Sequence, residues 1–260
     1  MRFRKNHRIQ VSFKSVTNTK TTLTKCKDKT HTFEEDSINL RNAVKLWLSN
    51  KRLAINIYGH ISRWDVSKVK DFSWLFANII YISSSDGGDF RQYLGDTTDF
   101  DEDLSCWNVS NAITMERMFE EAKKFNQPLN NWNVSKVKNM EGMFNFTENF
   151  NQPLDKWNVS NVETMKSMFN EAVNFNQPLN NWDVRNVINM RQMFYRASLF
   201  NQPLNNWNVG KVNNMDEMFE DAVKFNQDLS GWGVQIPKPN GFTNQNKFKN
   251  NTYLHPTWNV

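Results

Sequence analysis

The sequence predicts an α/β repeat solenoid, with parallel strands on one face, short helices on the other and an N-terminal cap. Two observations lead to this prediction. Trp recurs every 25 residues, at Trp107, Trp132, Trp157, Trp182, Trp207 and Trp232. After each Trp, the apolar spacing changes from that of a strand to that of a helix. A period within about 20–50 residues is typical of stacked repeats, whose units bury a core only against their neighbours.

The strand is predicted directly around each Trp. In residues 131–135, NWNVS, Trp132 and Val134 alternate with polar residues, so the apolar side chains point to one face. The helix follows at residues 140–147, MEGMFNFT, where apolar residues stand at i, i+3 and i+4. This Met and Phe spacing favours core packing over a role for the Met pairs as soft metal ligands.

Each predicted helix begins after a residue that caps helices well and ends before a turn. Such N-cap side chains accept hydrogen bonds from the free amides of the first turn. The capping positions are Asp71, Thr114, Asn139, Thr164, Asn189 and Asn214. The helix ends at Phe150 and its equivalents, after which Asn-Gln-Pro turns the chain towards the next strand.

The segments outside the regular repeats divide the chain. Residues 37–50 place Leu40, Ala43, Val44, Trp47 and Leu48 on one helical face, so we expect 37–60 to form an N-terminal helical cap. The solenoid itself is predicted over 61–235, with an insertion near 80–97 that should bulge from one edge. Residues 236–260 are expected to form a C-terminal cap, in which 258–260 contribute a last strand.

Residues 1–36 form a basic N-terminal arm. Residues 1–29 contain nine Lys and Arg against one acid, giving +8, whereas the remaining 23 bases and 26 acids give −3. Alternating residues in 8–14, RIQVSFK, predict a small β element. The basic patch consists of Arg2, Arg4, Lys5, Arg8 and Lys14. Such a patch suits nucleic acid, an acidic protein or an anionic membrane, and a solvated cap is an equal alternative.

The repeat resembles known families once its full phrase is considered. The frame LxxWxVxxVxxMxxMF looks like a leucine-rich repeat with Trp at the second apolar position. The phrase FNQPLNNWNVSNVxxMxxMFxxAxxFNQ resembles the BspA-like repeat, also called the mycoplasma-type 25-residue repeat. The opening segment, LRNAVKLWLSNKRLAINIYGHISRWDVS, resembles members from giant DNA viruses and some protists. The resemblance covers about residues 37–232 and implies a leucine-rich-repeat-like solenoid.

Cysteine usage and the N-terminus indicate where the protein acts. Cys26 and Cys106 do not have the short spacing of metal ligands, so we expect neither a metal site nor a disulfide framework. This cysteine usage favours a reducing compartment. The basic residues at 1–10 are not followed by an apolar core, which argues against a secretory signal. We therefore expect an intracellular location, in a host cytoplasm, or a virion.

No sequence motif supports catalysis. The four His residues are scattered, and there is no phosphate-binding or dinucleotide-binding glycine loop, so we expect no enzyme, no catalytic residues and no cofactor. The acidic run at 99–103 lacks the glycine and final glutamate of a calcium-binding loop. The constant Asn126 and its equivalents are expected to form a buried hydrogen-bonded ladder rather than a repeated ligand contact.

The best candidate for an interaction face is the polar row beside each Trp. It comprises Asn108, Asn133, Asn158, Asp183, Asn208, Lys156 and Arg185. An extended polar sheet of this kind binds proteins or glycans, or is plain solvated surface. We therefore expect a non-catalytic protein-interaction or structural module with a protein partner. The alternative function is nucleic-acid association through residues 1–30.

Overall fold

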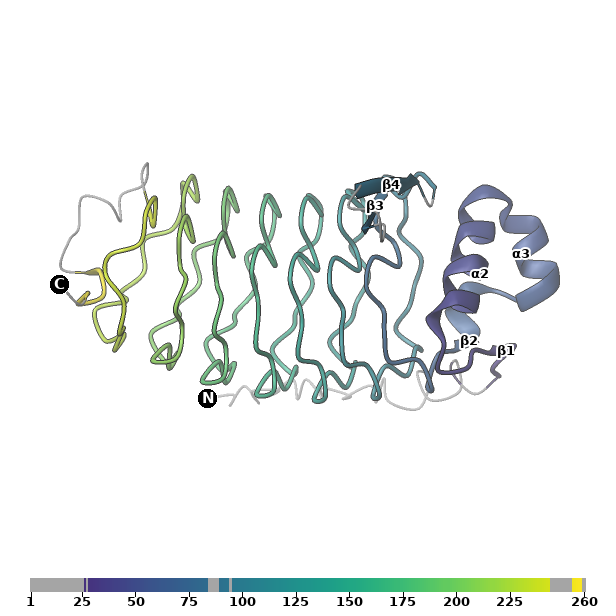
Figure 1. Ribbon diagram of the computed structural model, residues 1–260, viewed down its shortest axis with the longest axis horizontal. Helices are drawn as coiled ribbons and strands as arrows, with labels where there is room; N and C mark the ends of the chain where they lie inside the picture. The colour runs from purple at the N-terminus through teal and green to yellow at the C-terminus, as the bar shows by residue number, and fades with distance from the viewer. Residues whose placement is uncertain (1–25, 27, 84–88, 94, 244–253, 259–260) are drawn as a thin grey trace, which may run out of the picture.

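The repeats wind as successive coils stacked along the long axis of the molecule (Figure 1). The computed structural model describes residues 26, 28–83, 89–93, 95–243 and 254–258. One isolated parallel β-bridge joins each coil to the next. The bridged residues, in order along the stack, are Asp71, Thr114, Asn139, Thr164, Asn189 and Asn214. The residues predicted to cap helices therefore form the row that connects the coils.

The short helix predicted in each repeat is wrong. Within the described residues 95–243 no helix is present, and the Met-x-x-Met-Phe segment is a run of tight turns. In one repeat, Ser167 and Glu171 have φ values of 54° and 55°. A right-handed helix requires negative φ at every residue, so two positive values within five residues prevent one. The amides of Met168 and Ala172 instead close four-residue β-turns onto the carbonyls of Met165 and Phe169, at 3.1 Å each.

The amides between those turns bond to the next coil. Ser167 N donates to Arg191 O at 2.8 Å, and Phe169 N donates to Met193 O at 2.9 Å. A helix would have used these amides within the repeat. The predicted strand at 131–135 is also absent, although its alternation holds, because Trp132 and Val134 are buried while Asn133 is exposed. Apolar spacing thus identified the buried face but not the hydrogen-bond acceptors of the backbone amides.

The core consists of aromatic rows that run through the stack. The Trp of each repeat is buried, as predicted, with 2–3% of its surface exposed from Trp107 to Trp232. The rings of Phe144 and Phe169 stack across neighbouring coils, with centroids 5.6 Å apart, and Phe144 stacks on Phe150 within its own coil, with centroids 4.1 Å apart. The continuous core explains why one repeat alone would bury too little apolar surface to remain folded.

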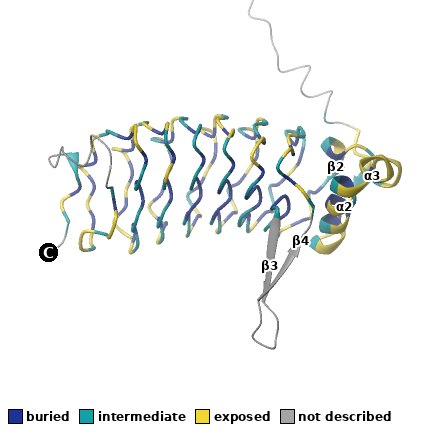
Figure 2. Cartoon of the chain, turned by 90° about the horizontal axis from the view of Figure 1, so that it is seen from above, coloured by how far each residue is buried: buried dark blue, intermediate teal, exposed yellow. Residues whose placement is uncertain are grey.

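Two helices cover the N-terminal end of the stack. Helix α2 spans Ser37–Ser49 and begins at Asp36, whose side chain accepts a hydrogen bond from Ile38 N. Its buried residues are Leu40, Ala43, Val44 and Trp47. Helix α3 spans Lys51–Tyr58 and lies outside α2 (Figures 1 and 2). Strand β1 (His31–Thr32), which precedes α2, pairs in parallel with β2 (Trp64–Asp65), which follows the short 3-10 helix η1 (Ile61–Arg63).

The insertion forms a β-hairpin at one edge of the stack. Strand β3 (Ile79–Ser83) pairs antiparallel with β4 (Asp89–Tyr93), and Figure 1 places the pair beside the first coils. At the other end, Phe219 N donates to Phe242 O at 2.9 Å, so the chain near 242 continues the stack. The last strand expected at 258–260 is not seen at Trp258, which packs on Phe242, and residues 259–260 lie outside the described part.

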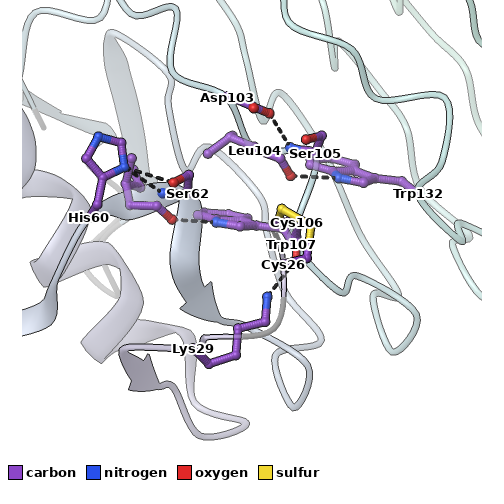
Figure 3. The surroundings of a disulfide bond; sticks show 11 residues. Cys26, Lys29, His60, Ser62, Asp103, Leu104, Ser105, Cys106, Trp107 and Trp132 are labelled. Atoms are coloured by element: carbon purple, nitrogen blue, oxygen red, sulfur yellow. Dashed lines mark hydrogen bonds between the residues drawn. A yellow bond between two sulfur atoms is a disulfide. The ribbon is translucent and has the colours of Figure 1, made fainter. Parts of the chain in front are cut away.

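A disulfide joins the N-terminal arm to the repeats, so the expectation of no disulfide was wrong. Cys26 and Cys106 are bonded across 80 residues of sequence (Figure 3). Lys29 secures the same junction, since its Nζ donates to Cys106 O at 2.6 Å. Burial lowers the pKa of Lys29, against the raising effect of nearby Asp65.

Removing the disulfide is expected to lower the free energy of unfolding by about 2–4 kcal/mol, because the closed loop is long and its unfolded ensemble would regain entropy. The measurement is urea unfolding of the oxidised wild type against the double variant Cys26→Ala/Cys106→Ala, followed by Trp fluorescence. Reduced wild type is the control and should match the double variant. Equal stability of all three samples would mean that the bond does not form.

Candidate functional site

A ridge of short polar side chains runs beside the buried Trp row. It consists of Asn108, Asn133, Asn158, Asp183 and Asn208, which are exposed except for the half-buried Asp183. Each of these five side chains accepts a hydrogen bond from the amide two residues later, as Asn133 does from Ser135 at 3.1 Å. Asn and Asp commonly stabilise turns in this way. The ridge therefore has a structural role in each turn in addition to its exposure.

The buried residues directly before and after each ridge residue hold it in place. Trp157 and Val159 flank Asn158 and point into the core, so Asn158 points outward. The indole Nε1–H of Trp157 donates to Leu129 O of the preceding coil at 3.0 Å. The same bond, from Trp to a Leu carbonyl 28 residues earlier, recurs at Trp132, Trp182, Trp207 and Trp232. The ridge is thus fixed by a core that repeats on each coil.

Charges differ along the ridge, although the core does not. Lys156 and Arg185, both predicted for the interaction face, are exposed. Arg185 Nε lies 2.8 Å from Asp183 Oδ1, whereas Lys156 borders an open depression of about 290 Å³ that includes Asn133 and Asn158. A second depression, of about 280 Å³, includes Asp183 and Arg185. Each of the two depressions thus brings predicted residues of two neighbouring coils onto one surface.

The constant Asn of the FNQ segment forms the predicted ladder. Asn151 N donates to Asn126 Oδ1 at 3.0 Å, and Asn176 N donates to Asn151 Oδ1 at 2.9 Å. The same contact continues through Asn201 and Asn226. The expectation that these side chains are buried was wrong, because they are half-buried or exposed. Each Asn side chain accepts a hydrogen bond from the backbone N–H of the Asn in the next repeat. This bond explains why the Asn is constant without invoking a ligand.

The acidic run at 99–103 does not converge on one point. Asp99 pairs with Lys124 at 2.6 Å, Glu102 pairs with Lys51, and Asp101 accepts the amide of Asn126. Within the part of the chain that the structure describes, no group of three or more His, Cys, Asp or Glu is placed to hold a metal ion. The basic patch of Arg2, Arg4, Lys5, Arg8 and Lys14, and the β element expected in the arm, lie outside the described residues.

A half-buried charged cluster was missed from the sequence. Arg117 pairs with Glu120 at 2.6 Å and lies over the ring of Trp74 at 4.9 Å. Burial raises the pKa of Glu120, although Arg117 and the hydrogen bond from Asn145 oppose the change. The spacing of Arg117 and Glu120, three residues apart, was the available signal. It was overlooked because Glu120 stands at a position that is polar but uncharged in several other repeats.

The stacked coils, their repeated core and the ridge define a tandem-repeat protein. A family model described as Mycoplasma protein of unknown function, DUF285, matches residues 10–91, 50–152, 85–175 and 147–258. These stretches cover more than half of the chain, and the protein therefore belongs to that family. Searches of curated proteins and of solved structures found no match.

Proposed function

We propose that this protein is a non-catalytic interaction or structural module that binds a protein partner along the ridge. The architecture we assign to it is a leucine-rich-repeat-like solenoid of the BspA-like type. The resemblance of the opening segment to giant-virus members extends the proposal to a protein that acts in an infected cell or a virus particle. The alternative, nucleic-acid binding through residues 1–30, rests on the charge of the arm alone.

The observation that supports the ridge is the contrast between constant and varying positions. The core Trp, Met and Phe repeat without change, whereas the position before each Trp varies and includes Lys156, and the position three after it varies and includes Arg185. Stability explains the constant residues. It does not explain two exposed charges on neighbouring coils beside open, polar depressions. Such shallow surfaces suit protein side chains better than the enclosed sites that small ligands prefer.

The test is site-specific photocrosslinking from the ridge in expressing cells. A photoreactive residue at Asn158 or Asn208 should yield one defined crosslinked protein, whereas the same residue at exposed Asn149, outside the ridge, should not. The double variant Lys156→Glu/Arg185→Glu should weaken the ridge crosslink because two charges are reversed. Equal crosslinking from Asn149 and from the ridge would contradict the proposal.

A further inference from the structure

The outermost helix has a surface that the fold leaves uncovered. Of the eight residues of α3, only Ala54 is buried. Leu53, Ile55 and Ile57 are 42%, 39% and 54% exposed. Helix α2 lies between α3 and the coils (Figures 1 and 2). A terminal cap of a repeat stack normally has a polar outer face, so three exposed aliphatic residues at this end require an explanation.

The charged residues of the two cap helices are all positive. Residues 37–58 contain Arg41, Lys45, Lys51 and Arg52 and no Asp or Glu. Arg41 pairs with Asp71, and Lys51 pairs with Glu102. Neither Lys45 nor Arg52 has an ion pair among the described residues, and both are exposed.

Aliphatic side chains on a basic helix suit a lipid surface. Leu53 and Ile57 stand four residues apart and therefore share one side of α3. A surface helix of this kind inserts its apolar residues at the headgroup boundary, while Lys and Arg attract anionic lipids. Nucleic acid would use the charges but would leave Leu53 and Ile57 without a role. A second copy of the same cap would bring like charges together.

We propose that the N-terminal cap docks on an anionic membrane surface through α3, using Leu53 and Ile57 for insertion and Lys45 and Arg52 for attraction. The docking site is at one end of the stack, so the ridge would extend away from the lipid. This inference does not depend on the protein partner proposed for the ridge. No helix among the described residues is long and apolar enough to cross a membrane, and docking needs none.

The test is flotation of the full-length protein with phosphatidylcholine vesicles that contain or lack phosphatidylserine. We expect binding only to the anionic vesicles and a decrease as salt is raised. Leu53→Ser/Ile57→Ser should weaken binding at least about tenfold, since two aliphatic side chains no longer leave water. Lys45→Glu/Arg52→Glu should weaken it by a similar factor. Because all four side chains are exposed, each variant should retain the melting temperature of the wild type.

The matched control is Ile188→Ser/Leu199→Ser, which removes two aliphatic residues of similar exposure, 43% and 44%, from the coils. This control should bind anionic vesicles as the wild type does. Equal binding to vesicles with and without phosphatidylserine, or equal loss in the control, would overturn the proposal. So would unchanged lipid binding in Leu53→Ser/Ile57→Ser, binding to duplex DNA in place of vesicles, or a dimer in solution that this variant abolishes.

Discussion

Replacing Trp157 by alanine is expected to lower the free energy of unfolding by about 3–5 kcal/mol, as for other large aromatic residues removed from a core. The indole is 3% exposed, stacks on Trp182 with ring centroids 6.4 Å apart and lies 6.4 Å from Phe144. The substitution opens a cavity between coils that already contact each other closely. It also leaves Leu129 O without the indole N–H that reaches it at 3.0 Å.

Urea unfolding monitored by circular dichroism measures the effect without relying on the fluorescence of the removed Trp. Trp157→Phe separates the two causes, because it keeps a ring but removes the N–H donor, and should cost about 1–3 kcal/mol. Asn131→Ala, at an exposed position, is the control and should change stability by no more than about 0.5 kcal/mol. If Trp157→Ala and Asn131→Ala lower the free energy of unfolding by similar amounts, the Trp row does not stabilise the stack.

The sequence was sufficient to identify the core. Trp132 and Val134 alternate with polar neighbours, and burial of alternate residues depends only on which way successive side chains point. The Met and Phe positions were also assigned correctly to the interior, since Met140, Met143 and Phe144 are fully buried. The helix at 37–50 could be predicted because its five apolar residues, from Leu40 to Leu48, recur at helical spacing.

The path of the backbone within each repeat was not predictable from that spacing. Met165, Met168 and Phe169 fit a helix, yet they are equally well buried by consecutive turns when Ser167 has positive φ. What distinguishes the two is whether an amide bonds within its own repeat or to the next coil. Because that choice involves residues 24 positions away, an argument from one segment cannot make it. The capping residue Thr164 was correctly recognised, since its side chain accepts the amide of Lys166, but it caps a turn.

The candidate site was predicted in position but not in role. The ridge residues are outward-facing, as the alternation indicates, whereas their hydrogen bonds to the amide two residues later emerge only from the turn geometry. The disulfide could not be inferred because 80 residues separate Cys26 from Cys106, and only the folded cap brings them together. The contacts of the Arg117–Glu120 pair with Trp74 and Asn145 could not be inferred from the sequence either, because those two residues come from other coils.

Deletion of one complete repeat is expected to be tolerated, whereas deletion of about half a repeat is expected to abolish folding. Removing residues 150–174 places Phe175 after Asn149. Phe175 can then take the place of Phe150, which stacks on Phe144 at 4.1 Å. Asn176 N can likewise reach Asn126 Oδ1, as Asn151 N does at 3.0 Å. Each remaining coil keeps a neighbour with the same core residues. The free energy of unfolding therefore falls only by the contribution of one unit, because the stability of such a stack is roughly additive.

Removing residues 150–161 instead shifts every later repeat out of register. Asn180 and Asn181 would then fall at the positions of Met168 and Phe169, which are fully buried. Each unsatisfied polar group buried in this way costs about 1–3 kcal/mol, and the mismatch recurs on every following coil. Circular dichroism and thermal melting of both purified proteins provide the measurement. The longer deletion should melt cooperatively and the shorter one should not, and equal damage from both would show that the repeats do not stack as interchangeable units.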